Sequence, residues 1–295
     1  MQGTIIKALS GFYYVYSDGV TYECKARGNF RKNGVSPLVG DRVEFEKIAE
    51  EKGVVDKISP RKNSICRPPV ANIDKLFIIS SFENPAPNTF LIDKMTVIAE
   101  YNDIEPIIVF NKCDMGDFSK WEKIYRKAGF KTYVVSADTG EGISELKKEL
   151  CNCVSAFTGN SGVGKSSILN CLLGGDFIAT GEVSEKIGRG RHTTRHTELY
   201  SVLEDGFVVD TPGFSSIELS MDDYALKEKL PLLFADFSDY IDNCKFSSCS
   251  HTKESGCGVL QALADGKIEP TRHESYIQLF EDMKDLKPWN LKKKK

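Results

Sequence analysis

The sequence predicts a multidomain α/β protein with an N-terminal β-barrel, a central mostly parallel sheet covered by helices, and a mainly helical C-terminal part. Three patterns predict it. Short strands crowd the first 65 residues, strands and helices alternate from there to about residue 220, and the strand pattern then disappears. We therefore divide the chain into domains at 1–65, 66–220 and 221–295.

The composition is that of a globular protein. Of 295 residues, 41% are hydrophobic and 27% are charged, which excludes a wholly disordered, collagen-like or disulfide-scaffold chain. No apolar run is long enough for a membrane span, and the N-terminus lacks the apolar core of a signal peptide. The nine cysteines are therefore expected to be reduced thiols or metal ligands. A net charge of −3, taken alone, argues weakly against a nucleic-acid partner.

The N-terminal part reads as about five short strands, which suit a small closed barrel, most commonly an OB-fold. Asp18-Gly19 is a hairpin signal, 41–46 alternates polar and apolar residues, and 54–58 follows a glycine. Residues 1–65 carry 11 Lys and Arg against 8 Asp and Glu, a net charge of +3. Aromatic and basic side chains on such a barrel can bind RNA, although the aromatics can equally be core residues.

The central part alternates between strands and helices after a linker expected at 67–69. The strands are expected at 76–79, 107–110, 132–135, 154–158 and 207–210. Asn88 is expected to cap a helix with Leu91, Met95 and Ile98 on one face. Further helices are expected from Ser119 to near Gly129, over 144–150, and from the end of the fourth strand to Gly174-Gly175. Such alternation predicts a parallel sheet with both faces covered.

A glycine-rich loop lies between a predicted strand and a predicted helix. It matches G-x-x-x-x-G-K-[ST] through Gly159, Asn160, Ser161, Gly162, Val163, Gly164, Lys165 and Ser166, with Ser167 next. Glycines let the backbone wrap around phosphate oxygens, and the helix N-terminus adds N–H donors. Lys165 would reach the β- and γ-phosphates, and the Ser166 hydroxyl would bind Mg²⁺.

A second motif points to the base. Asn111, Lys112, Cys113 and Asp114 resemble the N-K-x-D guanine motif of GTPases and follow a predicted strand, where such sheets bind ligands. In that resemblance Asp114 accepts hydrogen bonds from guanine, Asn111 braces the loop and the Lys112 stem covers the purine. Ser136 and Ala137 look like the start of the S-A-K loop that reads guanine O6, with Asp138 in place of lysine.

A third motif, D-x-x-G, begins at Asp210 and ends at Gly213. Asp210 would hold Mg²⁺ through water, and the Gly213 amide would sense the γ-phosphate. Upstream, Thr193 or Thr194 could complete the Mg²⁺ shell, and we favour Thr194.

The group that orients the attacking water is less obvious. Many GTPases carry a glutamine after D-x-x-G, but Phe214 stands here. His192 is the best candidate in this chain for that task, unless a partner supplies the group.

The order of these motifs is unusual. N-K-x-D at 111–114 precedes the phosphate loop at 159–166, the reverse of a Ras-like chain, so the GTPase is circularly permuted. The chain then leaves this domain directly after the switch at Gly213. The C-terminal part is therefore tethered to the segment that responds to γ-phosphate.

The C-terminal part contains C-x4-C-x-H-x5-C, formed by Cys244, Cys249, His251 and Cys257. Three thiols and one imidazole suit a closed, structural Zn²⁺ site. Four other cysteines are expected to pack in buried apolar surroundings, namely Cys113, Cys151, Cys153 and Cys171.

Together, the barrel, the permuted GTPase and the zinc ligands closely resemble the bacterial small-ribosomal-subunit-dependent GTPase family, RsgA. The resemblance implies a cytoplasmic enzyme that hydrolyses GTP to GDP and phosphate, binds the small ribosomal subunit late in its assembly and is stimulated by it. It also implies rRNA contact through the barrel and the zinc domain, and the family's histidine before the switch threonines matches His192. Nothing in the sequence demands more than a monomer, and no membrane partner is expected.

Two alternatives stay open from the residues alone: a passive RNA-binding module that holds GTP for structure, and a GTPase acting on another RNA such as transfer RNA. Positive charge concentrates in the barrel, the switch loop and the C-terminal tail, which weakens the argument from net charge. The basic residues of the switch loop are Lys186, Arg189, Arg191 and Arg195, and six lysines face one aspartate from Lys284 on.

Overall fold

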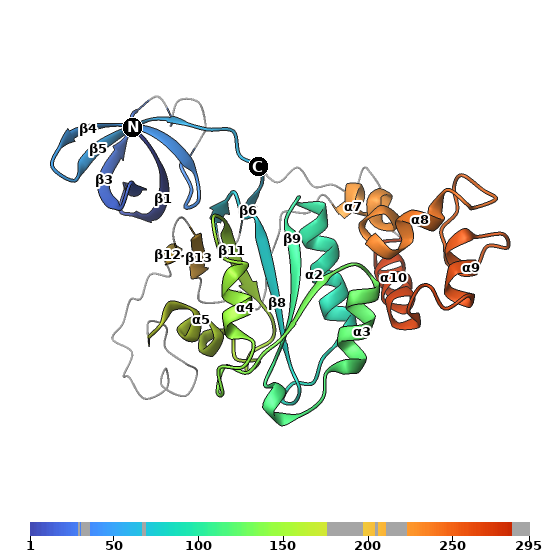
Figure 1. Cartoon of the computed structure of the whole chain (residues 1–295). Coiled ribbons are helices and arrows are strands. Elements are labelled where there is room, and N and C mark those ends of the chain that lie inside the picture. Colours follow the sequence, from blue (N-terminus) through green and yellow to red (C-terminus); the bar gives the residue numbers. More distant parts are fainter. Residues whose placement is uncertain are drawn as a thin grey trace.

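The computed structural model describes residues 1–28, 30, 36–66, 69–175, 197–203, 206–210 and 223–284. It contains a β-barrel, a central sheet flanked by helices, and a helical region at 223–284 that lies beside helix α2 (Figure 1). None of the helices in these ranges is long and apolar enough to cross a membrane.

The predicted barrel is present as five strands. They are β1 (Gln2–Leu9), β2 (Phe12–Ser17), β3 (Val20–Ala26), β4 (Arg42–Ala49) and β5 (Lys52–Ile58). They pair in the order β1-β2-β3-β5-β4, and β4 pairs back onto β1, so the barrel closes. Asp18 and Gly19 both have positive φ, the conformation of a two-residue hairpin between β2 and β3.

The central sheet runs β10-β9-β8-β11-β13-β12. Its strands are β8 (Lys75–Ser81), β9 (Glu105–Asn111), β10 (Lys131–Val134), β11 (Val154–Thr158), β12 (Glu198–Leu203) and β13 (Gly206–Asp210). All neighbours are parallel except β12, which pairs antiparallel with β13. The sequence reasoning missed β12, which also pairs with β1 through Lys7 and Glu198, so the barrel and the central sheet form one continuous sheet.

Helices cover both faces of this sheet, as predicted (Figure 1). One face carries α2 (Thr89–Tyr101) and α3 (Ser119–Lys127), and the other carries α4 (Ile143–Lys148) and α5 (Lys165–Leu173). Alternation along β8 explains this, because Ile78 packs on the α2 side while Phe77 and Ile79 pack on the α5 side. Asn88 caps α2 as expected, since its Oδ1 accepts the Leu91 N–H at 3.1 Å.

Two sequence expectations differ from the structure. Pro69, the last residue of the expected linker, begins β7 (Pro69–Ala71), which pairs antiparallel with β6 (Ser64–Cys66), whereas residues 67 and 68 lie outside the described residues. Cys151 and Cys171 are exposed rather than buried, because Cys151 lies in the turn before β11 and Cys171 lies on the outer side of α5. Cys153 is buried and Cys113 is half-buried.

The helical region has its own core. Its elements are α7 (Asp223–Lys229), η2 (Leu230–Leu233), η3 (Ala235–Phe237), α8 (Ser238–Ile241), α9 (Gly258–Ala264) and α10 (Pro270–Met283). Phe234, Phe237 and Tyr276 are fully buried, and their rings pack against one another in tilted and edge-to-face contacts. The core also includes Val97 of α2, so this region packs directly on the central domain.

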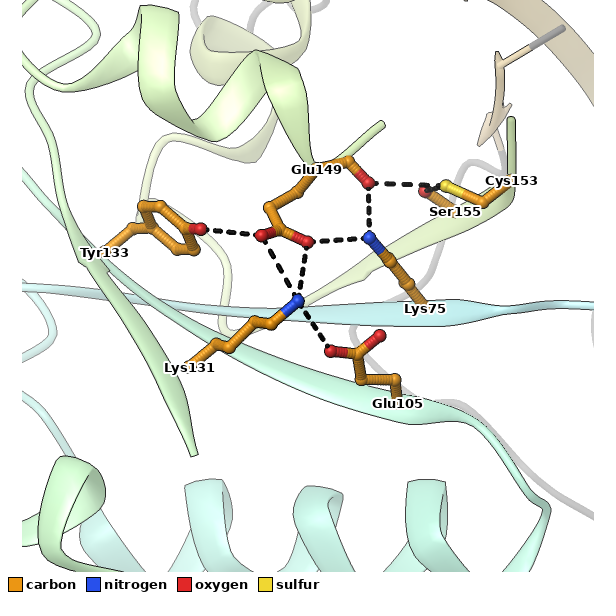
Figure 2. A network of polar contacts seen from close by, with 7 residues as sticks. All are labelled: Lys75, Glu105, Lys131, Tyr133, Glu149, Cys153 and Ser155. Atoms are coloured by element: carbon orange, nitrogen blue, oxygen red, sulfur yellow. Dashed lines mark hydrogen bonds and ion pairs between the residues drawn. The ribbon is translucent and has the colours of Figure 1, made fainter. Parts of the chain in front are cut away.

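A polar network ties α4 to the amino-terminal edge of the sheet (Figure 2). Glu149, just after α4, accepts hydrogen bonds from Lys75 at 2.6 Å, Tyr133 at 2.8 Å and Lys131 at 3.1 Å. Burial would raise the pKa of Glu149, but these donors outweigh burial and lower it to about 2. Two strands of the sheet, β8 and β10, are thus held to one carboxylate.

We predict that Glu149→Gln lowers the free energy of unfolding by about 1–3 kcal/mol at neutral pH, because charge-assisted hydrogen bonds are lost. The pKa of Glu149 is depressed in the folded state, so this stabilisation is present above the unfolded value of about 4.5 and is lost as the pH falls towards about 2. The gap between wild type and variant in urea unfolding should narrow over that range. Glu122→Gln, which breaks the exposed pair with Arg126, is the control, and an equal loss in both variants would contradict the prediction.

Candidate functional site: a nucleotide site and a metal cluster

The nucleotide site lies where the parallel strands end. Ser81 at the end of β8 is in register with Asn111 at the end of β9, and Thr158 of β11 is in register with Ile78. Parallel strands present their carboxyl ends at one edge, so the loops that follow them gather there. Because β13 runs parallel to β11, the backbone of Asp210 ends at this edge too.

The phosphate loop contains two glycines at which any side chain would collide with a neighbouring atom. Gly159 has a φ of +146°, and a Cβ there would lie 2.2 Å from the Ile79 carbonyl oxygen. Gly164 has a φ of +91°, and a Cβ there would lie 2.2 Å from the Asn111 amide nitrogen. The loop therefore lies directly against the backbone of β8 and against the Asn111 side chain at the end of β9.

Lys165 begins α5 and folds back over this loop. Its Nζ donates to the Gly159 carbonyl at 2.7 Å and to the Asn160 carbonyl at 2.8 Å. Burial lowers the pKa of Lys165. With Ser166 and Ser167 following in the first turn of α5, the loop combines a cation, hydroxyls and a helix N-terminus, a combination suited to a polyphosphate.

Asn111 joins the phosphate loop to the base-reading loop. Its side chain is buried, with 2% exposed. The amide Nδ2 donates to the Val163 carbonyl at 2.9 Å, and the Oδ1 accepts the Ala137 N–H at 3.1 Å. Two sequence motifs that lie far apart in the chain are thus brought together by one side chain.

The remaining base-reading residues surround Asn111. Lys112 has a left-handed backbone, with φ 67°, and turns the chain into the short helix η1 (Cys113–Met115), which carries the exposed Asp114. Ser136 is fully buried, and its Oγ accepts the Thr139 N–H at 3.2 Å.

Sequence reasoning missed the loop at 82–88, although it follows a strand at the same edge. The Phe82 ring lies on Gly116, where a Cβ would come within 2.2 Å of it, so the ring backs the end of the N-K-x-D segment. The Asn84 carbonyl oxygen lies 3.2 Å from where a Gly162 Cβ would be. This loop therefore backs both the base-reading segment and the phosphate loop.

The predicted switch residues lie outside the described residues. They are His192, Thr193, Thr194, Gly213 and Phe214, together with the four basic residues of the switch loop.

A separate cluster lies in the helical region. The candidate ligand atoms of Cys244, Cys249, His251 and Cys257 all lie within 4.8 Å of one another. The His251 Nδ1 is 3.5 Å from the sulfur of Cys244 and 3.5 Å from that of Cys257, and these two sulfurs are 3.9 Å apart. In a tetrahedral Zn²⁺ site two sulfurs lie about 3.8 Å apart, and a sulfur and a nitrogen about 3.6 Å. The four side chains therefore fit a tetrahedral metal.

Neighbouring groups hold these side chains in place. The Gly258 and Leu260 N–H groups donate to the Cys244 and Cys257 sulfurs, respectively, as expected for thiolates. Burial lowers the pKa of His251, which favours the neutral imidazole that a metal requires. His273, which sequence reasoning left without a role, is buried and donates through Nε2 to the His251 carbonyl at 2.8 Å.

Comparison with known families identifies the chain. A sequence model described as RsgA GTPase matches residues 58–220, and one described as RsgA N-terminal domain matches residues 2–55. The chain belongs to the RsgA GTPase family. Members of this family hydrolyse GTP, so the chain is a GTP hydrolase, and the family implies binding of a guanine nucleotide with Mg²⁺.

Curated relatives match this chain over nearly its whole length. The protein named "Small ribosomal subunit biogenesis GTPase RsgA" from Caldanaerobacter subterraneus subsp. tengcongensis is 44% identical, covering 97% of this chain and 96% of its own. The protein of the same name from Clostridium kluyveri is 40% identical, covering 98% and 100%.

Solved structures agree. YloQ, described as a circularly permuted GTPase, superposes with a TM-score of 0.81 at 33% identity, covering 97% of this chain and 96% of its own. YjeQ from Thermotoga maritima gives 0.80 at 33% identity, covering 97% and 99%. The predicted permutation, with an N-terminal barrel before the permuted GTPase, is confirmed.

We predict that Gly164→Ala weakens binding of a fluorescent GDP analogue about tenfold or more, because the new Cβ displaces the Asn111 amide that spans both loops. The matched control is Gly174→Ala at the end of α5. That glycine also has a positive φ, of +78°, but a Cβ there meets nothing within 4 Å. Both variants carry the backbone cost of a left-handed alanine, about 1–2 kcal/mol. Equal loss of affinity in both would refute the role of the contact with Asn111.

Proposed function

We propose that this protein is a GTPase that acts in late maturation of the small ribosomal subunit, hydrolysing GTP to GDP and phosphate and stimulated by that subunit. The observation that carries the proposal is the name of its relatives, together with the share of the chain that they match. Small ribosomal subunit biogenesis GTPases are 40–44% identical to it over nearly the whole chain. The hydrogen bonds by which Asn111 links the phosphate loop to the base-reading loop support the part of the proposal that concerns GTP binding.

The phosphate loop, 159–164, holds the β- and γ-phosphates through its backbone N–H groups, and Lys165 leaves its loop carbonyls to pair with them. Asp114 accepts hydrogen bonds from guanine, the Lys112 stem covers the base, and the loop at Ser136 and Ala137 helps to read O6. Asn111 positions these groups relative to the phosphates.

Ser166 and Thr194 hold the metal directly in this proposal, and Asp210 holds it through water. Mg²⁺, when bound, neutralises charge on the β- and γ-phosphate oxygens. The Gly213 amide contacts the γ-phosphate, and His192 orients the attacking water when the subunit is bound.

The cluster of Cys244, Cys249, His251 and Cys257 holds a structural Zn²⁺ in this proposal. The barrel at 1–65 and the zinc domain at 221–295 contact rRNA, flanking the GTPase domain at 66–220. The protein works in the cytoplasm as a monomer.

Turnover measured with purified subunits tests the proposal. We predict that small subunits raise the GTP hydrolysis rate at least about tenfold and co-sediment with the protein best in the presence of a non-hydrolysable GTP analogue. Lys165→Ala should abolish both effects, and His192→Ala should abolish the stimulation. Stimulation by large subunits or transfer RNA alone, or no stimulation with RNA affinity equal in GDP and GTP, would overturn the proposal.

Metal analysis tests the zinc cluster. We predict about one zinc ion per purified chain, lost in Cys249→Ser, with faster amide exchange in α9 and α10 because the metal holds the segment at 244–257 together. Cys151→Ser, which removes an exposed thiol outside the cluster, should leave zinc content and exchange unchanged. Zinc retained in Cys249→Ser would remove that cysteine from the ligand set.

A further inference from the structure

Helix α2 belongs to two hydrophobic cores at once. Ile92 and Ile98 pack in the core beneath the central sheet, with Phe110 of β9. Val97 packs in the core of the helical region, where Phe90 and Tyr101 border it. Helix α2 therefore forms the interface between the central domain and the helical region (Figure 1).

A largely buried ion triad connects this helix to the helical region. The Arg272 guanidinium of α10 donates through Nη1 to Asp93 of α2 at 2.7 Å and through Nη2 to Asp236 of η3 at 2.8 Å. Neither the Arg272 nor the Asp93 side chain is exposed at all. The guanidinium lies over the Phe130 and Phe234 rings, one from each domain, with its carbon 5.2 Å and 4.7 Å from their centroids.

The triad resists separation of the two domains. Burial would lower the pKa of Arg272, but the charges of Asp93 and Asp236 outweigh burial and raise it, so the guanidinium stays protonated. Pulling α10 away from α2 would break the pair of Arg272 with Asp93 and expose the apolar side chains around it to water, which is unfavourable. The helical region is thus held on α2 by the pair of Arg272 with Asp93 as well as by the covalent chain that follows β13.

The first half of α2 reaches the phosphate loop. Leu91 and Met95 line a cavity of about 60 Å³ together with three residues of the loop, Gly159, Asn160 and Val163. The 82–88 loop that leads into α2 also places the Asn84 carbonyl against Gly162. A shift of α2 would therefore change the packing behind the phosphate loop.

We propose that Asp93 and Arg272 are positioning residues that couple the helical C-terminal region to the phosphate-binding loop through helix α2. A nucleotide in the loop then stabilises the docking of α10 on α2, and docking in turn strengthens nucleotide binding by the same factor. The coupling needs only the isolated protein, so it stands or falls independently of the ribosomal partner proposed above.

The two aspartates provide a matched test. Both pair with Arg272 at nearly the same distance, but Asp236 lies in the same region as Arg272, whereas Asp93 lies on α2. Replacing Arg272 would leave two buried carboxylates and can prevent folding. The test therefore compares Asp93→Asn with Asp236→Asn, each of which keeps the size of the side chain and leaves Arg272 one charged partner.

For Asp93→Asn we expect the dissociation constant for GDP to rise roughly three- to tenfold. For Asp236→Asn we expect a change of less than about twofold, although both variants lose thermal stability. In the wild type and in Asp236→Asn, GDP should slow amide exchange in α10, and in Asp93→Asn it should not. Lys127→Ala, which breaks an ion pair with Glu269 at the partly exposed edge of the same interface, should behave as the wild type.

Two results would overturn the coupling. One is an equal change in GDP affinity in the two aspartate variants, which would indicate a general loss of stability. The other is α10 exchange in the wild type that does not respond to GDP, because reciprocal coupling requires that response.

Discussion

The site depends on several loops that lie together at one edge of a parallel sheet. The Asn111 side chain links two of them by hydrogen bonds. One amide group donates to the phosphate loop and accepts from the base-reading loop. A buried amide that satisfies two backbone groups from different loops fixes their separation, which a nucleotide must span. The Phe82 ring and the Asn84 carbonyl back the same loops from β8, so the site rests on three strands at once.

Circular permutation leaves this edge intact, because strand order and register, rather than chain order, decide which loops are neighbours. It does change how the flanking parts are attached. The barrel joins the sheet through β1 and β12, and the helical region joins through α10 and α2. The sequence indicated that the C-terminal part is tethered to the switch segment. The buried ion triad gives it a second, rigid attachment.

The cluster of Cys244, Cys249, His251 and Cys257 is supported by surrounding hydrogen bonds. Four side chains bring their ligand atoms within 4.8 Å of one another, and the backbone N–H groups at the start of α9 donate to two of the sulfurs. Behind them, His273 and Tyr276 of α10 donate to the carbonyls of His251 and Ser250. A metal held here would therefore also order the helix that carries Arg272, because α10 supports both the cluster and the ion triad.

The sequence by itself determined the motifs, their permuted order, the five-strand barrel and the four-residue cluster, because each is written in local spacing or in a run of residue types. Tertiary structure decided what depends on distant partners. Strand β12 pairs with both domains, Asp93 meets Arg272 across 179 positions, and Asn111 meets Val163 across 52. The burial of the cysteines also depended on tertiary structure. Cys151 and Cys171 were expected to be buried because thiols are apolar, but both are exposed. Local patterns carry no information about which surfaces pack together, and packing alone turns a charged residue such as Asp93 into a buried link between domains.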